Sequence, residues 1–301
     1  MRRNTVLRKR EKYLSKLPSL VGKVCVVTGG TGSLARNLIL NLLFLGARVY
    51  FTYRSESKAK KLLEELSRFS SDLFAFPLDL SVKEEVFSFL KRLPERIDFF
   101  FHVAGTYHRP LERTKDGYER TYQTDFLSIL WIDEELLRNH PETRIIHTGS
   151  VSMYYSKVDF KDPMSLRCAK TIRYGRDKRL LALYVLALKR RYPVRSFVLA
   201  HPGVSATSLF QSEKGGFGKA FETFLVPLMK VIFMKPWKAS LSLLLGAFAG
   251  DGEKELVAPR GLFHSWGYPK VISLRKSLLE SREKEDMERL IAKEKERIVS
   301  N

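Results

Sequence analysis

The sequence predicts an α/β fold in which a doubly wound parallel β-sheet carries helices on both faces. Short, continuously apolar runs alternate with longer amphipathic segments along most of the 301-residue chain. Strands that are apolar throughout are typical of parallel sheets, whose two faces are both covered by helices. The first apolar run leads into a glycine-rich turn, and no repeat or linker rich in Pro, Gly or Ser divides the chain. We therefore expect a single sheet-based domain.

The predicted strands and helices follow one another in a regular order. The apolar runs predict strands at residues 24–28, 48–53, 73–78, 97–103, 144–148 and 194–200. The amphipathic segments predict helices at residues 34–45, 58–68, 82–93, 118–138 and 177–191. Because crossovers between parallel strands are right-handed, these helices are placed on both faces of the sheet.

The two ends of the chain differ in composition from the middle. We expect a basic leader at residues 1–22, one large domain at residues 23–270 and a charged C-terminal helix at residues 271–301. Within the large domain, residues 217–249 are apolar and helical in pattern. The last helix, predicted at residues 274–299, has few apolar positions, so we expect it to be solvated or to dock on a partner.

The formal net charge of +20 is concentrated in residues 1–23 and 166–195. Such a surface attracts phosphate groups, whether on a dinucleotide, an anionic lipid or a nucleic acid. A solvated cationic surface that aids solubility is the alternative interpretation. We do not expect nucleic-acid binding, because no recognition motif accompanies the charge.

Several absences in the sequence bear on its compartment. There is no apolar run of about 18 residues, so no transmembrane helix is expected, and the N-terminus lacks the apolar core of a secretory signal. Cys25 and Cys168 form no CxxC pair, which indicates free thiols in a reducing compartment. We expect a cytoplasmic protein, with peripheral membrane contact as a second hypothesis. The six histidines show no metal-ligand spacing, so no metal is expected.

The glycine-rich turn carries the first functional signal. Residues 28–35 (TGGTGSLA) contain the pattern GxGxxA at Gly30, Gly32 and Ala35, between a predicted strand and a predicted helix. Glycines allow a tight turn and let backbone N–H groups approach a pyrophosphate, and the helix N-terminus favours negative charge. The pattern therefore predicts the dinucleotide-binding turn of a Rossmann-type fold, with an ordinary glycine-rich turn as the alternative.

Arg54 follows the second predicted strand, where this fold meets the adenosine ribose. An acidic residue there accepts a hydrogen bond from the ribose 2′-OH, whereas an arginine accommodates a 2′-phosphate. The strand ends in Arg54 and Ser55, without a carboxylate. We therefore expect NADP(H) to be preferred over NAD(H). The alternative is an ordinary surface arginine.

Further motifs occur in a fixed order, at the ends of predicted strands or on the next helix. They are Asp79-Leu80 after the third strand, Ala104-Gly105 after the fourth, Ser150 after the fifth, Tyr174-Gly-Arg-Asp-Lys178 (YxxxK), and Pro202-Gly203-Val204 with Thr207 after the sixth. In order and spacing they resemble the short-chain dehydrogenase/reductase family from about residue 23 to residue 209. The phrases GARVYFTYR, YQTDFLSILWI, RIIHTGS and HPGVSATSL resemble its retinol-dehydrogenase-like branch.

The resemblance implies hydride transfer between a nicotinamide dinucleotide and an alcohol or carbonyl compound. A free tyrosine has a pKa near 10 and is a poor base at neutral pH, so Lys178, one helical turn from Tyr174, would favour the phenolate. Ser150 would hydrogen-bond the substrate oxygen, with Ser152 as a competing candidate. The positions that would bind the cofactor are Thr28, Gly29, Gly30, Thr31, Gly32, Ser33, Leu34, Arg54, Asp79, Leu80, Ala104, Gly105, Tyr174, Lys178, Pro202, Gly203, Val204 and Thr207.

Some positions depart from the family pattern. Ser33 and Ala35 occupy the last two glycine positions of the common turn TGxxxGxG, and Val103 replaces the asparagine of the motif NAG. Asp125, the fourth predicted catalytic residue, stands where the family usually has an asparagine that supports a water-mediated proton relay to the lysine. These departures leave a second hypothesis, an NAD(P)-binding regulator or scaffold with decayed catalysis.

The family selects its substrates with the segment after the sixth strand. Here residues 205–237 form a predicted lid rich in Phe, Leu and Met, which indicates a lipophilic alcohol or carbonyl substrate. Core packing or a homodimer face is the alternative. Lysines in the same segment would also suit contact with an anionic membrane. A third functional class, a peripheral membrane or nucleic-acid adaptor that uses the basic surface, follows from the charge alone.

Overall fold

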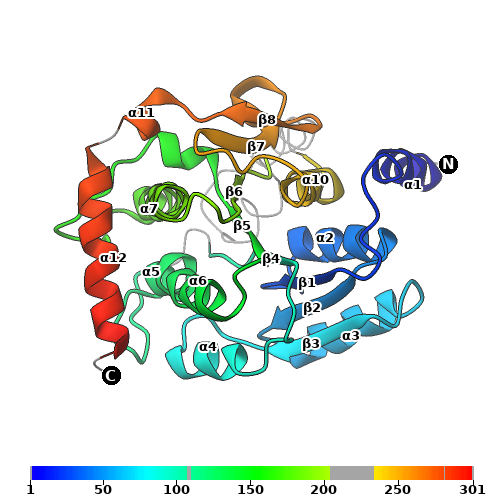
Figure 1. Cartoon of the computed structure of the whole chain (residues 1–301), viewed down its shortest axis with the longest axis horizontal. Helices are drawn as coiled ribbons and strands as arrows, with labels where there is room; N and C mark the ends of the chain where they lie inside the picture. Colours follow the sequence, from blue (N-terminus) through cyan, green and yellow to red (C-terminus); the bar gives the residue numbers. More distant parts are fainter. Residues whose placement is uncertain (1, 107–109, 204–233, 281, 300–301) are drawn as a thin grey trace, which may run out of the picture.

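The computed structural model describes residues 2–106, 110–203, 234–280 and 282–299, and in these residues eight strands form one sheet (Figure 1). The sheet order is β3-β2-β1-β4-β5-β6-β7-β8, and every neighbouring pair is parallel except β7 and β8. The predicted doubly wound parallel α/β fold is confirmed. The strands are β1 Val24–Val27, β2 Arg48–Tyr53, β3 Leu73–Pro77, β4 Phe99–His102, β5 Arg144–Thr148, β6 Phe197–Ala200, β7 Glu255–Pro259 and β8 Pro269–Ser273.

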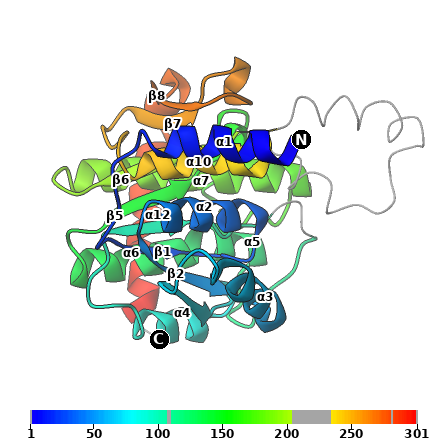
Figure 2. The ribbon, with the colours of Figure 1, turned by 90° about the vertical axis from the view of Figure 1, so that its right-hand side faces the viewer.

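Helices cover both faces of the sheet (Figures 1 and 2). Successive strand residues point to opposite faces, so that Val26 and Phe100 enter one apolar core while Val27 and Phe101 enter the other. Each fully buried large side chain contributes about 1.5–3 kcal/mol to stability. The first core is covered by α4 (Lys83–Leu90), α6 (Ser128–Asn139), α7 (Lys170–Arg191) and α12 (Glu283–Val299), and the second by α2 (Ser33–Phe44), α3 (Glu56–Leu66) and α10 (Pro236–Gly246).

The basic leader contains a helix that the sequence did not predict, α1 (Arg2–Leu14). Arg10 fixes it to α2, donating from Nε to Asn41 Oδ1 and from Nη2 to the Asn37 carbonyl, both at 2.7 Å. Leu14 is buried in the core beneath α2. In the sequence Arg10 belongs to a basic run that suggested a solvated surface. Its partners Asn37 and Asn41 lie about thirty residues away, so no local pattern indicates this contact.

The charged tail is packed against the domain, so the expectation of a solvated or partner-docking helix is wrong. It forms α11 (Lys276–Leu279) and α12 rather than one helix. Met287 and Ile291 of α12 are buried in the core that contains α7, and Glu283 forms an ion pair with Arg179 of α7. A few apolar residues are enough to pack α12 against the domain, because they all lie on one face of this helix.

Other boundaries differ locally from the prediction. The helix predicted at residues 118–138 is divided into α5 (Arg120–Tyr122), a π-helical turn η1 (Gln123–Leu127) and α6. Helix α7 begins at Lys170, seven residues before the predicted start. Strands β7 and β8 were not predicted from the sequence. None of the helices in the described parts of the chain is long and apolar enough to cross a lipid bilayer.

Candidate active site

The predicted site residues that the structure describes lie around one edge of the sheet. Parallel strands place their carboxyl ends at the same edge, and β1 stands between β2 and β4, where the direction of the crossovers reverses. Ligands of doubly wound sheets bind outside the strand ends at this reversal point. The glycine turn follows β1 directly and therefore lies at the expected place.

Thr28 joins the glycine turn to the end of β4. Its Oγ1 accepts hydrogen bonds from the backbone N–H groups of Val103 and Ala104, each at 3.0 Å. Gly29 has φ = +66°, and a Cβ added there would lie 2.9 Å from the Ala104 Cα. Both the left-handed backbone and this close approach require glycine. Val103, which departs from the family's asparagine, therefore takes part through its backbone.

The next two glycines of the pattern have different physical causes. A Cβ on Gly30 would lie 2.4 Å from the Phe51 ring of β2, so Gly30 is required by packing inside the protein. A Cβ on Gly32 would meet only the Gly29 carbonyl oxygen, at 3.2 Å, and Gly32 is exposed. Gly32 is also the N-cap of α2 and offers no side chain to the first-turn N–H groups. The first-turn N–H groups of α2 and the helix dipole therefore form a phosphate-binding site, which we call the cradle.

This difference gives a prediction for two matched substitutions. We expect Gly30→Ala to destabilise the fold by about 1–3 kcal/mol, because its methyl group overpacks against Phe51. We expect Gly32→Ala to leave the melting temperature nearly unchanged and to weaken dinucleotide binding, because its methyl group faces the cradle. Thermal unfolding and a fluorescence titration with NADPH measure the two effects. Equal effects of both substitutions on stability would contradict this assignment.

The end of β2 lies beside the glycine turn. Thr52 accepts a hydrogen bond from Gly29 N at its Oγ1 (3.0 Å) and one from Gly30 N at its carbonyl oxygen (2.8 Å). Arg54, two residues farther on, is exposed and makes no hydrogen bond or ion pair with the residues that the structure describes. Its guanidinium is therefore available to a ligand held at the turn.

The motif after β3 is divided between the site edge and the core. The Asp79 carboxylate accepts hydrogen bonds from the Ser81 N–H (2.9 Å) and hydroxyl (2.8 Å) and is half-buried. The Leu80 side chain is buried in the core, and its carbonyl oxygen accepts a hydrogen bond from the Ser128 hydroxyl at 2.6 Å. Of these two predicted cofactor positions, only Asp79 presents a side chain near the edge.

Lys178 is buried between β5 and the π-helical turn. Its Nζ donates to the Thr148 carbonyl oxygen at 3.2 Å and lies 3.7 Å from Asp125 Oδ2. It also lies 5.9 Å from the centre of the Tyr174 ring. Burial by itself would lower the pKa of Lys178, but the acidic groups around it, of which Asp125 contributes most, together outweigh burial and raise it. Lys178 is therefore a fixed positive charge beside Tyr174.

Asp125 is held in place from the opposite side. Its Oδ1 accepts from the backbone N–H of Thr106 at 2.9 Å and from the Thr106 hydroxyl at 3.3 Å. The π-helical turn η1 carries Asp125 into this position, and such turns are frequent at functional sites. A Cβ added to Gly105 would come within 3.4 Å of Asp125 and 3.6 Å of Lys178. Asp125, Gly105 and Lys178 thus meet in one place, as the resemblance implies.

The two competing serines are hydrogen-bonded to each other. Ser152 donates to Ser150 Oγ from its hydroxyl at 2.9 Å and from its backbone N–H at 3.3 Å. They begin the short helix η2 (Val151–Tyr154), which packs along α7, since Arg179 donates to the Met153 carbonyl. Both serines therefore lie on the segment beside the α7 turn that carries Tyr174, and the structure favours neither alone.

The last motif is only partly described. Pro202 and Gly203 follow β6, and Gly203 has φ = +87°. Its position is close-packed, since an added Cβ would lie 3.0 Å from the Ser265 carbonyl oxygen. Val204, Thr207 and residues 205–233 of the predicted lid lie outside the described residues.

Sequence reasoning missed one buried acid inside the YxxxK motif. Asp177 is fully buried, and neither carboxyl oxygen has a hydrogen-bond partner among the described residues. Burial, together with the negative charges of Asp125 and Glu119, holds the pKa of Asp177 well above its usual value. The nearby bases are Lys178 and Arg173, and Arg173 lies 3.7 Å from Glu119. Burial and these negative charges therefore favour the protonated form of Asp177. Its motif position was the only available signal.

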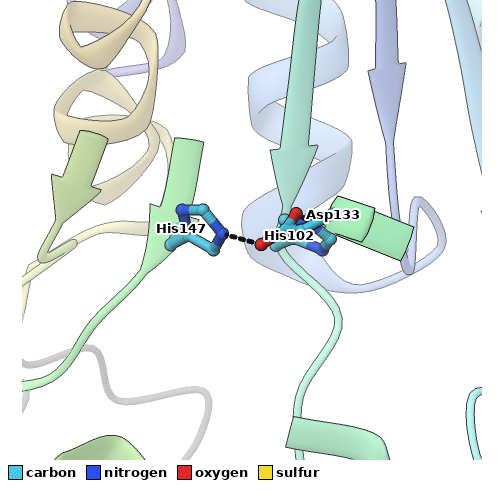
Figure 3. Close-up of side chains that lie close together, drawn as sticks. All are labelled: His102, Asp133 and His147. Carbon is cyan, nitrogen blue, oxygen red and sulfur yellow. Dashed lines mark hydrogen bonds and ion pairs between the residues drawn. The ribbon is translucent and has the colours of Figure 1, made fainter. Parts of the chain in front are cut away.

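A second buried cluster was also missed, because its members are scattered along the chain. His102 from β4, His147 from β5 and Asp133 from α6 converge beneath the site edge (Figure 3). Their potential metal-ligating atoms all lie within 4.8 Å of one another. Each histidine Nε2 lies 2.8 Å from a different oxygen of the Asp133 carboxylate. We call these three residues the His–Asp–His cluster.

The residues present at the site edge fit a nicotinamide dinucleotide. The uncapped N-terminus of α2 suits its pyrophosphate, and the unpaired Arg54 suits a phosphate on its adenosine ribose. Lys178 lies one helical turn from Tyr174, with its ammonium group held by Thr148 and Asp125. Ser33, one of the departures from the family pattern, is an exposed first residue of α2 and does not fill the turn.

Comparison with known proteins decides the family. Residues 23–159 match the sequence profile of the short chain dehydrogenases. An uncharacterized oxidoreductase of Schizosaccharomyces pombe is 31% identical, over 82% of this chain and 81% of that protein. The chain belongs to the short-chain dehydrogenase/reductase family. It is an NAD(P)-dependent oxidoreductase with the Rossmann fold that its sequence predicts.

Two further similarities agree with this family and with its fold. Retinol dehydrogenase 14 of Mus musculus is 28% identical, over 62% of this chain and 63% of that protein, which agrees with the predicted retinol-dehydrogenase-like branch. The RhlG/NADP active-site complex of Pseudomonas aeruginosa has the same fold, with a TM-score of 0.58 and 20% identity. The structural match covers 82% of this chain and 98% of the RhlG chain.

Proposed function

We propose that this protein is an NADP(H)-dependent oxidoreductase that interconverts a lipophilic alcohol and the corresponding carbonyl compound. The observation that carries the proposal is the buried, charged Lys178, held by Thr148 and Asp125 beside the Tyr174 ring. A fixed positive charge next to a tyrosine favours the phenolate and so makes an acid–base group that works near neutral pH.

The residues take the following roles in this proposal. A bound nicotinamide supplies or accepts the hydride. Tyr174 gives a proton to the substrate oxygen during reduction and takes it back during oxidation. Ser150, with Ser152 donating to it, orients that oxygen. Asp125 holds Lys178 charged, in place of the asparagine usual in the family, and the glycine turn binds the pyrophosphate.

NADP(H) preference is supported by the free guanidinium of Arg54 beside the glycine turn. We expect Arg54→Glu to reverse the preference, because a carboxylate repels a 2′-phosphate and accepts from a ribose 2′-OH. Loss of one charge-assisted phosphate contact corresponds to about 1.5–3 kcal/mol, or roughly ten- to hundred-fold weaker NADPH binding. Arg48→Glu, at the other end of β2, is the control and should alter neither affinity. Titrations of wild type and of both variants with NADPH and NADH measure these affinities.

A lipophilic substrate is supported by exposed apolar side chains near Gly203. Leu262 and Trp266 are 65% and 45% exposed, and the Ser265 carbonyl of the same loop packs on Gly203. Retinol, in the name of the mouse relative, is itself a lipophilic alcohol. With the net charge of +20, these side chains also support peripheral contact of a cytoplasmic protein with an anionic membrane. We include a homodimer in the proposal as an expectation from the sequence.

The decisive experiment is a reductase assay with NADPH across carbonyl compounds that range from small and polar to fatty aldehydes, steroids and retinoids. Turnover of the lipophilic compounds supports the proposal. Turnover of small polar compounds alone contradicts the substrate class. Tight NADPH binding without turnover of any compound favours the regulator or scaffold instead, and absence of NADPH and NADH binding contradicts both.

A further inference from the structure

The His–Asp–His cluster lies directly behind the groups that hold the active site. All three side chains are essentially fully buried, at 0–1% exposure. His102 and His147 are register partners on adjacent strands, and their rings stack at 4.9 Å between centroids. Asp133 reaches them from α6, as Figure 3 shows. One carboxylate thus bridges β4 and β5.

The hydrogen bonding of the cluster follows from its charges. Burial by itself would raise the pKa of Asp133, but His147 and His102 outweigh burial and lower it to about 2. Asp133 is therefore ionised and accepts a hydrogen bond from each Nε2–H. A charge-assisted hydrogen bond is about twice as strong as a neutral one, and low dielectric strengthens it further. The aromatic rings of Phe100 and Tyr184 pack beside His102 and His147, respectively.

Two features of the cluster argue against a metal centre. Histidines that bind a metal donate their second ring nitrogen to a hydrogen-bond partner. Here the Nδ1 atoms of His102 and His147 are buried without such a partner among the described residues. A metal site also needs an entry path, and these side chains are closed off from solvent. Hydrogen bonding to one carboxylate accounts for the geometry without an ion.

The cluster is connected to both halves of the site through the backbone. The His102 carbonyl oxygen accepts from the Thr148 hydroxyl at 2.6 Å, and the Thr148 carbonyl oxygen in turn accepts from Lys178 Nζ. After His102, the next two backbone N–H groups, of Val103 and Ala104, donate to Thr28 Oγ1 at the glycine turn. The anchors of Lys178 and of the glycine turn therefore each lie within two residues of a clustered histidine.

We propose that Asp133 is a positioning residue of the active site. By holding His102 and His147 side by side, it fixes the carboxyl ends of β4 and β5, and through them Lys178 and the glycine turn. The catalytic consequence rests on the proposed function, because it requires Lys178 to act on Tyr174. The structural consequence, a fixed pair of strand ends, does not depend on that function.

The chain offers a matched control for this proposal at the opposite end of the same two strands. Thr143, which precedes β5, is buried, and its hydroxyl donates to the carbonyl oxygen of Ile97, which precedes β4, at 2.7 Å. Thr143→Val also removes a buried link between the strands, but far from the site. Asp133→Asn keeps one hydrogen-bond acceptor and gains donors, so it can still bridge the two rings once one histidine changes tautomer.

The first readout is hydrogen exchange followed by mass spectrometry and NMR on the intact chain. We expect Asp133→Ala to speed exchange of the Val103 and Ala104 N–H groups at least tenfold relative to wild type. Asp133→Asn should speed it less than Asp133→Ala does, because the amide can still bridge the two rings, and Thr143→Val should leave it unchanged. Equal exchange in Asp133→Ala and Thr143→Val overturns the proposal. If Asp133→Ala does not fold, Asp133→Ser serves in its place, because serine can hold at most one ring.

The second readout is the pH–rate profile with the best carbonyl substrate. Misplacement of a catalytic group by about 1 Å can cost about 10²-fold in rate. We expect such a loss of kcat in Asp133→Ala, with the apparent pKa of the profile moved upward. Loss of stability alone would move neither value for the folded protein. If wild type turns over nothing, the proposed function fails while the exchange data still decide the proposal. One bound metal ion per purified chain, found by elemental analysis, overturns it.

Discussion

Replacing Tyr174 with phenylalanine is expected to lower turnover about 10²–10⁴-fold, the usual contribution of a positioned acid–base group. The substitution removes only the hydroxyl, so the ring contact with Lys178 is kept. The ion pair of Lys178 with Asp125 and its bond to Thr148 are also kept. NADPH affinity and melting temperature should therefore remain close to those of wild type. Steady-state kinetics and an NADPH titration of the same preparation measure both parts.

Tyr155→Phe is the matched control for this prediction. Tyr155 lies on the segment after β5, is 66% exposed and has no lysine one helical turn away. It should keep wild-type turnover. If Tyr174→Phe stayed active while Tyr155→Phe did not, the acid–base role would belong to another tyrosine. If neither affected a measurable turnover, proton transfer would have to be assigned to a group other than these two.

The placement of the predicted site residues at one edge of the sheet could be predicted from the sequence, because in this fold the order of elements along the chain determines which residues lie close together. In a parallel sheet every strand end reaches the same edge, so Thr28, Ala104 and Ser150 could be placed there from their positions after apolar runs. Lys178 could be placed beside Tyr174 because four residues make about one helical turn. These predictions need only local patterns and the handedness of the crossovers.

The parts that were missed depend on contacts between distant segments. The His–Asp–His cluster is formed when strand register sets His102 opposite His147, and no spacing along the chain reveals it. Helix α1 depends on the partners that α2 offers to Arg10. The role of Gly30 could not be separated from that of Gly32, because only the structure shows Phe51 against one of them.

Asp177→Asn is expected to stabilise the folded protein at neutral pH, which is unusual for a fully buried polar position. The Asp177 carboxyl has no hydrogen-bond partner among the described residues, and its pKa is well above its ordinary 3.8. Below about pH 3.8 both the folded and the unfolded chain hold this proton, so it contributes nothing. As pH rises above 3.8, the unfolded chain releases the proton while the folded chain keeps it. The free energy of unfolding then falls by up to about 1.4 kcal/mol per pH unit until the folded pKa is reached.

The Asp177→Asn variant lacks this loss, so its advantage over wild type should grow from pH 4 toward pH 7. Turnover at neutral pH should persist, because a neutral amide replaces a neutral acid beside Lys178. Asp133→Asn is expected to show the opposite pH dependence of stability. The folded pKa of Asp133 is about 2, below its ordinary 3.8, so its stabilising contribution is present above pH 3.8 and is lost as pH falls toward 2. That difference corresponds to about 2 kcal/mol.

Urea unfolding between about pH 2 and pH 8 tests both signs in one experiment. At pH 7 the free energy of unfolding should rank Asp177→Asn above wild type and wild type above Asp133→Asn. The advantage of Asp177→Asn should vanish by about pH 4, whereas the deficit of Asp133→Asn should stay constant down to about pH 4 and shrink only toward pH 2. An Asp177→Asn variant that is less stable than wild type by the same amount at every pH would show that the carboxyl is ionised and paired in the folded state. The two aspartates are equally buried. Opposite slopes would therefore show that hydrogen-bond partners, and not burial alone, decide which buried acid keeps its proton.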